Sequence, residues 1–159
     1  MAARFAADSM LGSLARKLRL YGFDVVYSSD ADDSLLLKLC QEERRTLLTS
    51  DRQLHFLALR RGAQTVLITS KGDVNMVTQV FRALKLDPSL SPAMSRCPLC
   101  NGEIKEISKG DAAPFVKQGV LSHHNSFYQC DSCQQVYWEG GHWFNLVLFE
   151  REVREALKQ

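Results

Sequence analysis

The sequence has no long apolar run and no low-complexity tract. No stretch of its 159 residues approaches the about 20 apolar residues needed to cross a bilayer, and the N-terminus lacks a basic segment leading into an apolar run. We therefore expect a soluble, cytoplasmic protein without a membrane partner. The composition, 45% hydrophobic and 24% charged, excludes a disordered chain and provides enough apolar residues for a buried core.

An excess of one charge is also lacking, because the net charge is only +2. Domains that bind nucleic acids usually show a strong basic excess or a clustered basic face, so only the distribution of charge is informative here. The basic residues gather in the first half of the chain, where they are Arg16, Lys17, Arg19, Arg44, Arg45, Arg52, Arg60 and Arg61. We expect contact with a polyanion in that half.

Only five cysteines are present, and four of them form two C-x-x-C pairs, Cys97 with Cys100 and Cys130 with Cys133. Two such pairs can bring four thiolates around one tetrahedral zinc ion, which predicts a structural zinc site and a reducing compartment. Zinc also supplies folding free energy that so small a module cannot obtain from its own core. Redox chemistry, two disulfides or an iron–sulfur cluster are the alternatives for these cysteines.

Histidines are few, and the four-cysteine set needs none of them as a ligand. His123, His124 and His142 lie in the same half of the chain and could in principle replace a cysteine. The fifth cysteine, Cys40, lies among leucines at helical spacing. We expect it to be a buried thiol on an apolar helix face.

Short apolar runs alternate with amphipathic segments in the first half of the chain. The periodicity predicts strands at 4–7, 23–27, 46–49 and 65–68, with helices at 9–20, 33–44, 52–61 and 74–84. This βαβαβαβα order is typical of an α/β fold, a mainly parallel sheet flanked by helices.

A change of pattern at residues 87–95 predicts a boundary between two parts. This segment contains Pro88, Pro92 and three serines, and it interrupts every periodicity. We expect an α/β domain at 1–93 and a zinc-ribbon module with a C-terminal helix at 94–159. The second part contains the cysteine pairs, an aromatic strand at 136–138 and a helix from about residue 145 to 157.

Aspartates follow the predicted strands of the first half. Asp8 follows the first strand, Asp51 the third, and Asp33 opens the helix after the second, with Asp30 and Asp32 close by. Residues placed just after the carboxyl ends of parallel strands converge on one crevice. Crowded carboxylates repel one another unless a hard cation neutralises them, so the pattern predicts a Mg²⁺ or Mn²⁺ site for phosphoryl chemistry.

Thr49 and Ser50 directly precede Asp51. Thr49 or Ser50 could hold an attacking water or a ligand carboxylate in place. The alternative is that each aspartate merely caps a helix.

The same residues resemble a known family, the PIN-like Mut-seven carboxy-terminal RNase domain. The segments that carry the resemblance are 5–12, 14–19, 22–24, 47–52, 96–102 and 136–143. The resemblance implies a PIN-like α/β fold with an appended zinc ribbon and a metal-dependent RNase activity that uses acidic residues. It carries over to Asp8 and Asp51, and to Asp33 as the third acid, with Asp30 and Asp32 as alternatives.

Two further positions bear on this resemblance. Asp73 is the candidate for the fourth acid that PIN sites often have. Ser50 stands where the family often has arginine, which removes one phosphate contact.

We therefore expect a metal-dependent ribonuclease in which Asp8, Asp33 and Asp51 hold Mg²⁺ or Mn²⁺. Single-stranded RNA is the expected partner, bound by Arg16, Lys17, Arg19 and Arg52 with help from the ribbon. The ribbon aromatics, Phe127, Tyr128, Tyr137, Trp138 and Trp143, either stack on bases or form the core of the module. The alternatives are an inactive RNA-binding or adaptor module, a DNA nuclease and a phosphatase. The sequence does not predict an oligomeric state.

Overall fold

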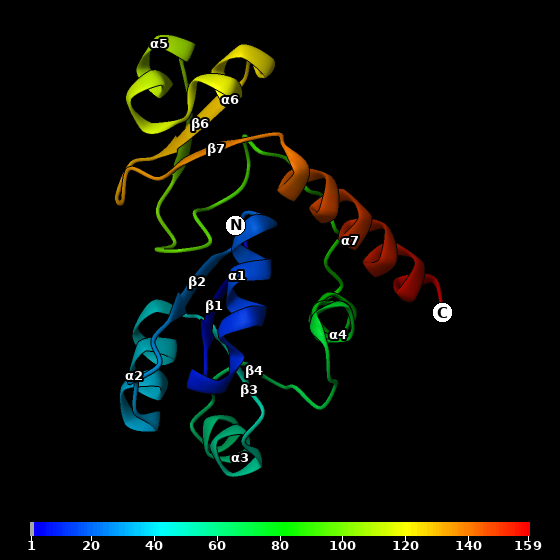
Figure 1. The fold of residues 1–159 in the computed structure, drawn as a ribbon. Helices are drawn as coiled ribbons and strands as arrows, with labels where there is room; N and C mark the ends of the chain where they lie inside the picture. The colour runs from blue at the N-terminus through cyan, green and yellow to red at the C-terminus, as the bar shows by residue number, and fades with distance from the viewer. Residues whose placement is uncertain (1) are drawn as a thin grey trace.

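Four parallel strands form the central sheet of the first half of the chain (Figure 1). The computed structural model describes residues 2–159, and the strands are β1 (Arg4–Ala7), β2 (Asp24–Tyr27), β3 (Thr46–Thr49) and β4 (Thr65–Leu67). Their order is β2-β1-β3-β4, so the chain moves from β1 to one side and then crosses back to reach β3. The boundary between β1 and β3 is therefore the switch point at which open parallel sheets usually bind ligands.

Helices cover both faces of this sheet. A 3-10 turn, η1 (Ser9–Leu11), leads into α1 (Gly12–Leu20), and the later strands are followed by α2 (Asp33–Glu43), α3 (Arg52–Arg60) and α4 (Asp73–Leu84). Successive residues of a strand point to opposite faces. Phe5 and Ala7 pack with α1 and α4, whereas Ala6 packs with α2 and α3. The result is a three-layer α/β/α arrangement with one apolar core on each side.

A second, antiparallel sheet follows in the order β5-β6-β7. Its strands are β5 (Ile104–Ile107), β6 (Phe127–Cys130) and β7 (Val136–Trp138), and three short helices, α5 (Lys109–Ala112), η2 (Ala113–Phe115) and α6 (Gln118–His123), lie between the first two. In the described part of the chain, the buried apolar cluster of this ribbon comprises four residues, Ala112, Leu121, Phe127 and Val136. A core of this size is too small to hold a module together without an additional constraint.

The C-terminal helix, α7 (Gly141–Lys158), runs from the ribbon back along α4 (Figure 1). Val153 is fully buried in the core that α1 and α4 form, and Phe149 and Leu157 pack against the same core. Arg82 of α4 donates a hydrogen bond to the carbonyl of Ala156 at 2.8 Å. The helix expected within the second module thus packs on the first, while a domain boundary near residue 93 stays a prediction.

The segment that joins the two parts runs against the end of α1. Gly22 has φ +88°, and a Cβ at this position would lie 2.5 Å from the carbonyl oxygen of Met94. The Ser95 hydroxyl donates to the carbonyl of Leu20 at 2.7 Å, and the Arg96 amide donates to the carbonyl of Arg19 at 2.8 Å. The proline-containing segment is therefore held by direct contacts to the first part.

The predicted fold class is confirmed, and most predicted elements are present. The strand predicted at 23–27 begins one residue later, and the helix predicted at 9–20 is divided into η1 and α1. α7 begins at Gly141, earlier than expected. β5, β6 and the three short helices were not predicted, because their residues lack a clear apolar period. Within residues 2–159, no helix combines the length and the apolar character that crossing a membrane requires.

Candidate functional site

Asp8 and Asp51 lie at the carboxyl ends of two neighbouring strands, β1 and β3. The Asp8 amide donates to the carbonyl of Leu48 at 2.9 Å, which extends the strand pairing by one residue and fixes the Asp8 backbone beside β3. The Asp8 side chain is 7% exposed. Its Oδ1 accepts hydrogen bonds from the amide and the hydroxyl of Ser9, at 2.6 and 3.3 Å.

The hydroxyl of Thr49 connects the two aspartates. Thr49 is fully buried, and its Oγ1 donates to Oδ2 of Asp8 at 2.9 Å while accepting the amide of Asp51 at 3.0 Å. Oδ1 of Asp51 accepts the amides of Gln53 and Leu54, at 2.7 and 3.2 Å, and so caps α3. Asp51 therefore caps a helix and also lies at the acidic edge, so the two interpretations of this residue are compatible.

Asp33, at the start of α2, is influenced by the charges of Asp8 and Asp51. Asp33 is exposed, but some loss of solvation raises its pKa, and the negative charges of Asp8, Asp51 and Asp32 raise it further. Asp32 is used as the N-cap of α2, because it accepts the amide of Leu35 at 2.7 Å. Asp30 lies in the exposed turn before α2. Asp33 is thus the better candidate for the third acid.

Asp73, the candidate fourth acid, lies at the start of α4 and faces α1. One carboxylate oxygen accepts the Ser13 hydroxyl at 2.6 Å, and the other lies 3.8 Å from Nζ of Lys17. Lys17 also lies over the ring of Phe149, 4.4 Å from the centroid. These contacts occupy Asp73 within the α1–α4–α7 face, so it remains only a candidate.

A divalent cation fits the donor chemistry of the acidic edge. The carboxylates are hard oxygen ligands, and their mutual repulsion, which raises the pKa of Asp33, is what a cation would relieve. Within residues 2–159, the three aspartates do not bring ligand atoms within 4.8 Å of one another. Mg²⁺ is usually held by one or two carboxylates and several waters, and that is the mode which this spacing suits.

The four cysteines of the ribbon do come together. One potential ligand atom from each of Cys97, Cys100, Cys130 and Cys133 lies within 4.8 Å of the others, with 3.6 Å between Sγ of Cys97 and Cys133 and 3.4 Å between Sγ of Cys100 and Cys130. Sulfurs around a tetrahedral zinc ion at about 2.3 Å stand about 3.8 Å apart. The cluster therefore fits a structural zinc ion.

The two C-x-x-C turns have the same backbone geometry. The amide of Asn101 donates to the carbonyl of Cys97 at 2.8 Å, and the amide of Gln134 donates to the carbonyl of Cys130 at 3.1 Å. Asn101 and Gln134 both adopt positive φ, +71° and +64°. A Cβ on Gly102 would lie 2.7 Å from Sγ of Cys130, so glycine is required there.

Tyr137 contacts the cysteine cluster through its hydroxyl, which lies 3.1 Å from Sγ of Cys97. Burial raises the pKa of Cys97, but hydrogen bonds from Tyr137 and from the amides of Cys100 and Leu99 outweigh this effect and lower the pKa to about 7. Loss of solvation raises the pKa of the neighbouring Cys100 thiol, so Cys97 loses its proton more readily than Cys100 does.

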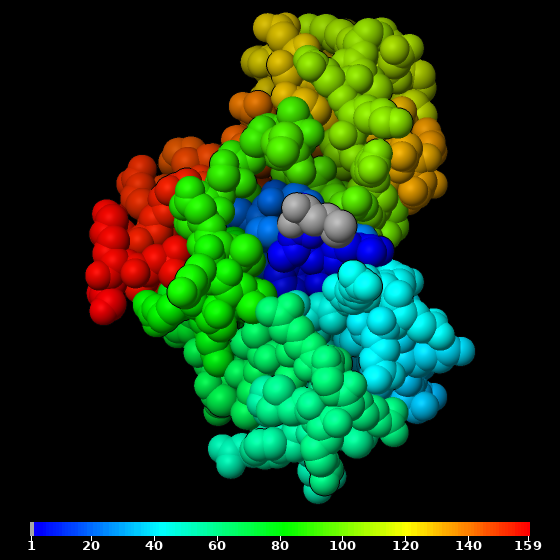
Figure 2. Space-filling view, turned by 180° about the vertical axis from the view of Figure 1, so that it is seen from behind, coloured from blue at the N-terminus to red at the C-terminus, as the bar shows by residue number. Residues whose placement is uncertain are grey.

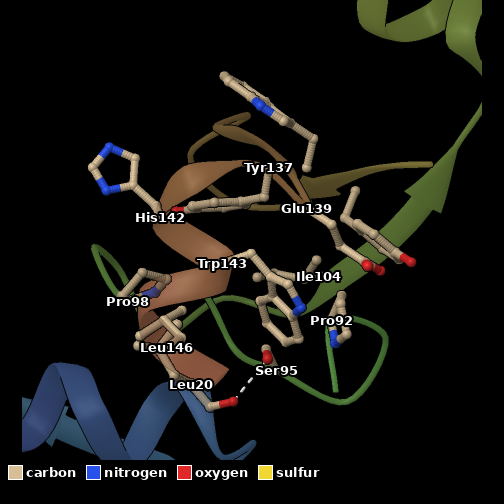
Figure 3. Close-up of a pocket in the computed structure, with 12 residues that line it drawn as sticks. Leu20, Pro92, Ser95, Pro98, Ile104, Tyr137, Glu139, His142, Trp143 and Leu146 are labelled. Atoms are coloured by element: carbon tan, nitrogen blue, oxygen red, sulfur yellow. Dashed lines mark hydrogen bonds between the residues drawn. The ribbon is translucent and has the colours of Figure 1, made fainter. Parts of the chain in front are cut away.

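The ribbon aromatics serve mainly as packing residues. Phe127 is fully buried in the ribbon core, and Tyr128 is 9% exposed. Trp143 and Tyr137 line a 90 Å³ cavity where the ribbon meets α7 and the end of α1, with Leu20 and Leu146 in its floor and Glu139 at its rim (Figure 3). The cavity forms part of the seam between the two halves.

Arg19 was expected to contact RNA, but the structure corrects this expectation. Its side chain is 5% exposed, and Nε and one terminal nitrogen donate to the carbonyl of Val25 at 3.0 and 2.8 Å. The other terminal nitrogen donates to the carbonyl of Pro98 at 2.9 Å. Arg19 therefore joins α1, β2 and the first cysteine turn. Arg19 continues the helical spacing of the buried residues of α1. The sequence did not reveal this, because Arg19 also belongs to a cluster of basic residues.

Asn101 makes a second connection that the sequence did not reveal. Its carboxamide oxygen accepts the amide of Val25 at 3.0 Å, and its nitrogen donates to Oδ1 of Asp24 at 2.8 Å. The first cysteine turn thus pairs with the edge strand β2. A polar residue at positive φ directly after a C-x-x-C pair was the only available signal.

Replacing Arg19 with methionine should weaken this seam. Methionine fills similar space but leaves the carbonyls of Val25 and Pro98 without their donor, and each unsatisfied buried acceptor costs about 1–3 kcal/mol. We expect the free energy of unfolding in urea to fall by about that amount, with zinc still bound. An unchanged unfolding midpoint, compared with the exposed control Arg16→Met, would contradict this role.

The ribbon and the acidic edge lie at opposite ends of the central sheet. The ribbon contacts residues at the start of β2, whereas Asp8 and Asp51 follow the ends of β1 and β3. In Figure 1 the ribbon accordingly lies above the sheet, and α2 and α3 lie beside and below it. Any RNA contact of the ribbon is therefore at least one strand length, roughly 13 Å, from the acidic residues.

Among the other predicted RNA contacts, Arg16 and Arg52 have exposed side chains. Arg52 is the first residue of α3 and directly follows Asp51. Lys17 is half-buried and is already paired with Asp73. The accessible positive charge closest in sequence to the acidic edge is thus that of Arg52.

The geometry describes an α/β/α protein with acidic residues at the switch point of its sheet and an appended four-cysteine ribbon. The family model of the Mut7-C RNAse domain matches residues 3–149, and the chain belongs to this family. No curated protein matches the sequence. The family match confirms the resemblance, points to a nuclease and implies RNA as the substrate.

Proposed function

We propose that the protein is a metal-dependent ribonuclease that hydrolyses phosphodiester bonds at the Asp8–Asp33–Asp51 cluster. The observation that supports the proposal best is the Thr49 hydroxyl, which joins Asp8 and Asp51 at the ends of two neighbouring strands. Loss of solvation and the charges of Asp8 and Asp51 also raise the pKa of Asp33. Acids from three separate βα units therefore share one region of negative potential. Membership of an RNase family indicates that the reaction in this region would be the hydrolysis of RNA.

A bound Mg²⁺ or Mn²⁺ ion would supply charge neutralisation and a more acidic water. The chain's own residues hold its carboxylates in place. Asp8 is fixed by Ser9 and Thr49, and Asp51 is fixed by the first turn of α3. One carboxylate oxygen of Asp51, Oδ2, makes no hydrogen bond within residues 2–159, so it is available to an incoming ligand.

Hydrolysis forms a bond from the water oxygen to phosphorus and breaks the bond from phosphorus to the leaving oxygen. The negatively charged phosphate is repelled as it approaches the three aspartates. Arg52, exposed and adjacent to Asp51, is placed to offset part of that repulsion.

We propose zinc only for the ribbon, where all four ligand positions are sulfur and none is open for catalysis.

Thr49 is proposed as a positioning residue, and Thr49→Val tests it. Valine keeps the shape but removes the donor to Asp8 and the acceptor for the Asp51 amide. We expect kcat to fall about 10–100-fold, the range for groups that orient metal ligands, with a higher Mn²⁺ concentration needed for half-maximal rate. Thr49→Ser should restore both. If Thr49→Val changes stability but neither kinetic quantity, the hydroxyl has only a structural role.

The experiment that tests the function is cleavage of a labelled single-stranded RNA, with a matching DNA strand and a phosphomonoester assayed alongside. Cleavage of RNA that depends on added Mg²⁺ or Mn²⁺ would support the proposal. RNA binding without turnover at any metal concentration would instead favour an inactive RNA-binding module. Omitting the divalent ion is a better control than a chelator, because a chelator would also strip the ribbon zinc.

A further inference from the structure

A groove between α2 and α3 begins at the acidic edge. It is lined by Asp33 of α2 and by residues of α3, namely Gln53, Leu54, Phe56, Leu57, Leu59 and Arg60. Asp33 thus belongs both to the proposed catalytic cluster and to the wall of the groove. In Figure 2, α2 (cyan) and α3 (blue-green) lie side by side at the end of the molecule away from the ribbon.

The face of α3 that borders the groove combines positive charge with exposed apolar surface. Arg52, Phe56 and Arg60 follow one another at intervals of four residues, so their side chains lie along one side of the helix. Phe56 is 57% exposed, and Leu59 beside it is 49% exposed. Phe56 and Leu59 together give this face exposed apolar surface beside the two arginines.

The arginines of this face form no ion pair within the described chain. α3 contains no acidic residue, and across residues 2–159 neither Arg52 nor Arg60 forms an ion pair or a side-chain hydrogen bond. The face therefore suits a polyanion that also offers flat apolar rings. An apolar protein surface would match the phenyl ring but would leave both guanidinium groups without counter-charges.

We propose that this groove binds the part of a single-stranded RNA that flanks the cleaved bond. An unpaired base stacks on Phe56, and phosphates contact Arg52 and Arg60. The proposal rests on the proposed nuclease function for the position of the cleaved bond. Duplex RNA does not fit this mode, because its bases are already stacked on each other.

The length of α3 sets the size of the bound segment. Arg52 and Arg60 are separated by a rise of about 12 Å along the helix. A fully stacked strand advances about 3.4 Å per nucleotide, so this interval spans at most about three or four nucleotides of a single strand. Extending a substrate by that number on the groove side should lower KM, and further extension should have little effect.

The test compares Phe56→Ala with Phe115→Ala, a matched control in the ribbon whose ring is 55% exposed. Binding of a labelled 12-nucleotide RNA is measured by fluorescence anisotropy in an Asp51→Asn background, which prevents turnover and keeps the α3 cap. We expect Phe56→Ala to weaken binding about 5- to 100-fold, as expected for one lost base stack, and Phe115→Ala to change it less than twofold. Phe56→Trp should restore binding.

The arginines have their own comparison. Arg60→Gln should lower the slope of log affinity against log salt by about 0.7, the value for one phosphate contact of a single strand. Arg61→Gln, the neighbouring arginine that does not line the groove, should leave the slope unchanged. Equal slopes in both variants would overturn the proposed phosphate contact.

Two outcomes would overturn the proposal as a whole. One is equal RNA affinity in Phe56→Ala and Phe115→Ala. The other is a wild-type dimer in light scattering that Phe56→Ala dissociates while RNA affinity is retained, which would assign the face to a second copy of the chain. If the wild type cleaves RNA and Phe56→Ala has no effect, the proposal for the groove is wrong and the proposed nuclease function stands. If RNA binding depends on Phe56 but no cleavage occurs, the proposed nuclease function is wrong and the groove stands as an RNA-binding surface.

Discussion

Replacing Asp8 with asparagine is expected to lower RNA cleavage by at least about 100-fold. Removing a group that merely orients a metal ligand costs about 10–100-fold, so loss of a proposed ligand itself should cost at least as much. The change removes the charge but keeps the shape: the carboxamide oxygen can still accept from Ser9, and the carboxamide nitrogen can donate to the Thr49 hydroxyl. Asp51→Asn should lower cleavage to the same extent. The variant should still fold, because asparagine caps α3 as well as aspartate does.

The measurement is the initial rate of cleavage of labelled RNA with added Mn²⁺, together with the unfolding midpoint of each variant. Asp32→Asn is the matched control, because Asp32 lies next to Asp33 but is used as the cap of α2. We expect that variant to retain at least half of the wild-type rate. Full activity of both Asp8→Asn and Asp51→Asn in folded protein would exclude the aspartate cluster as the cleavage site.

Replacing Cys97 with alanine should release the zinc and unfold the ribbon. Structural zinc contributes about 10–16 kcal/mol of apparent binding free energy in small modules, far more than the few buried side chains of this ribbon can supply. Zinc is released in unfolded protein and quantified with a chromogenic chelator, and the aromatic circular dichroism of Tyr137 and Trp138 reports on the ribbon. We expect about one zinc per wild-type chain and none in the variant.

Cys40→Ala provides the control for this prediction. Cys40 is 3% exposed in the core beneath α2 and α3, where burial raises the pKa of the thiol to about 11. The alanine variant should keep its zinc, with only a modest loss of stability from the smaller side chain. A wild-type protein with iron, or with disulfides that resist mild reduction, would contradict the zinc assignment.

The consequences of zinc loss should extend beyond the ribbon. Arg19 and Asn101 join the first cysteine turn to α1 and β2, and α7 enters the core of the first half. Loss of the ribbon therefore removes contacts on which the edge of the central sheet depends.

The sequence by itself determined the local features of this protein. Period-2 and period-3.6 patterns predicted the four strands and four helices of the first half, since each segment buries one face. The cysteine spacing predicted the four-sulfur cluster, because short C-x-x-C turns place both thiolates on one side. The order of elements predicted that residues after strand ends would share an edge.

Only the tertiary structure decided matters that depend on distant contacts. It separated the buried Arg19 from the exposed Arg16, because burial depends on the ribbon packing against the end of α1. It brought Asp33 under the influence of Asp8 and Asp51, whose charges raise its pKa, since charge coupling depends on distance and not on sequence separation. It also placed the ribbon and the acidic edge at opposite ends of the sheet, because strand register fixes which residues meet at each edge.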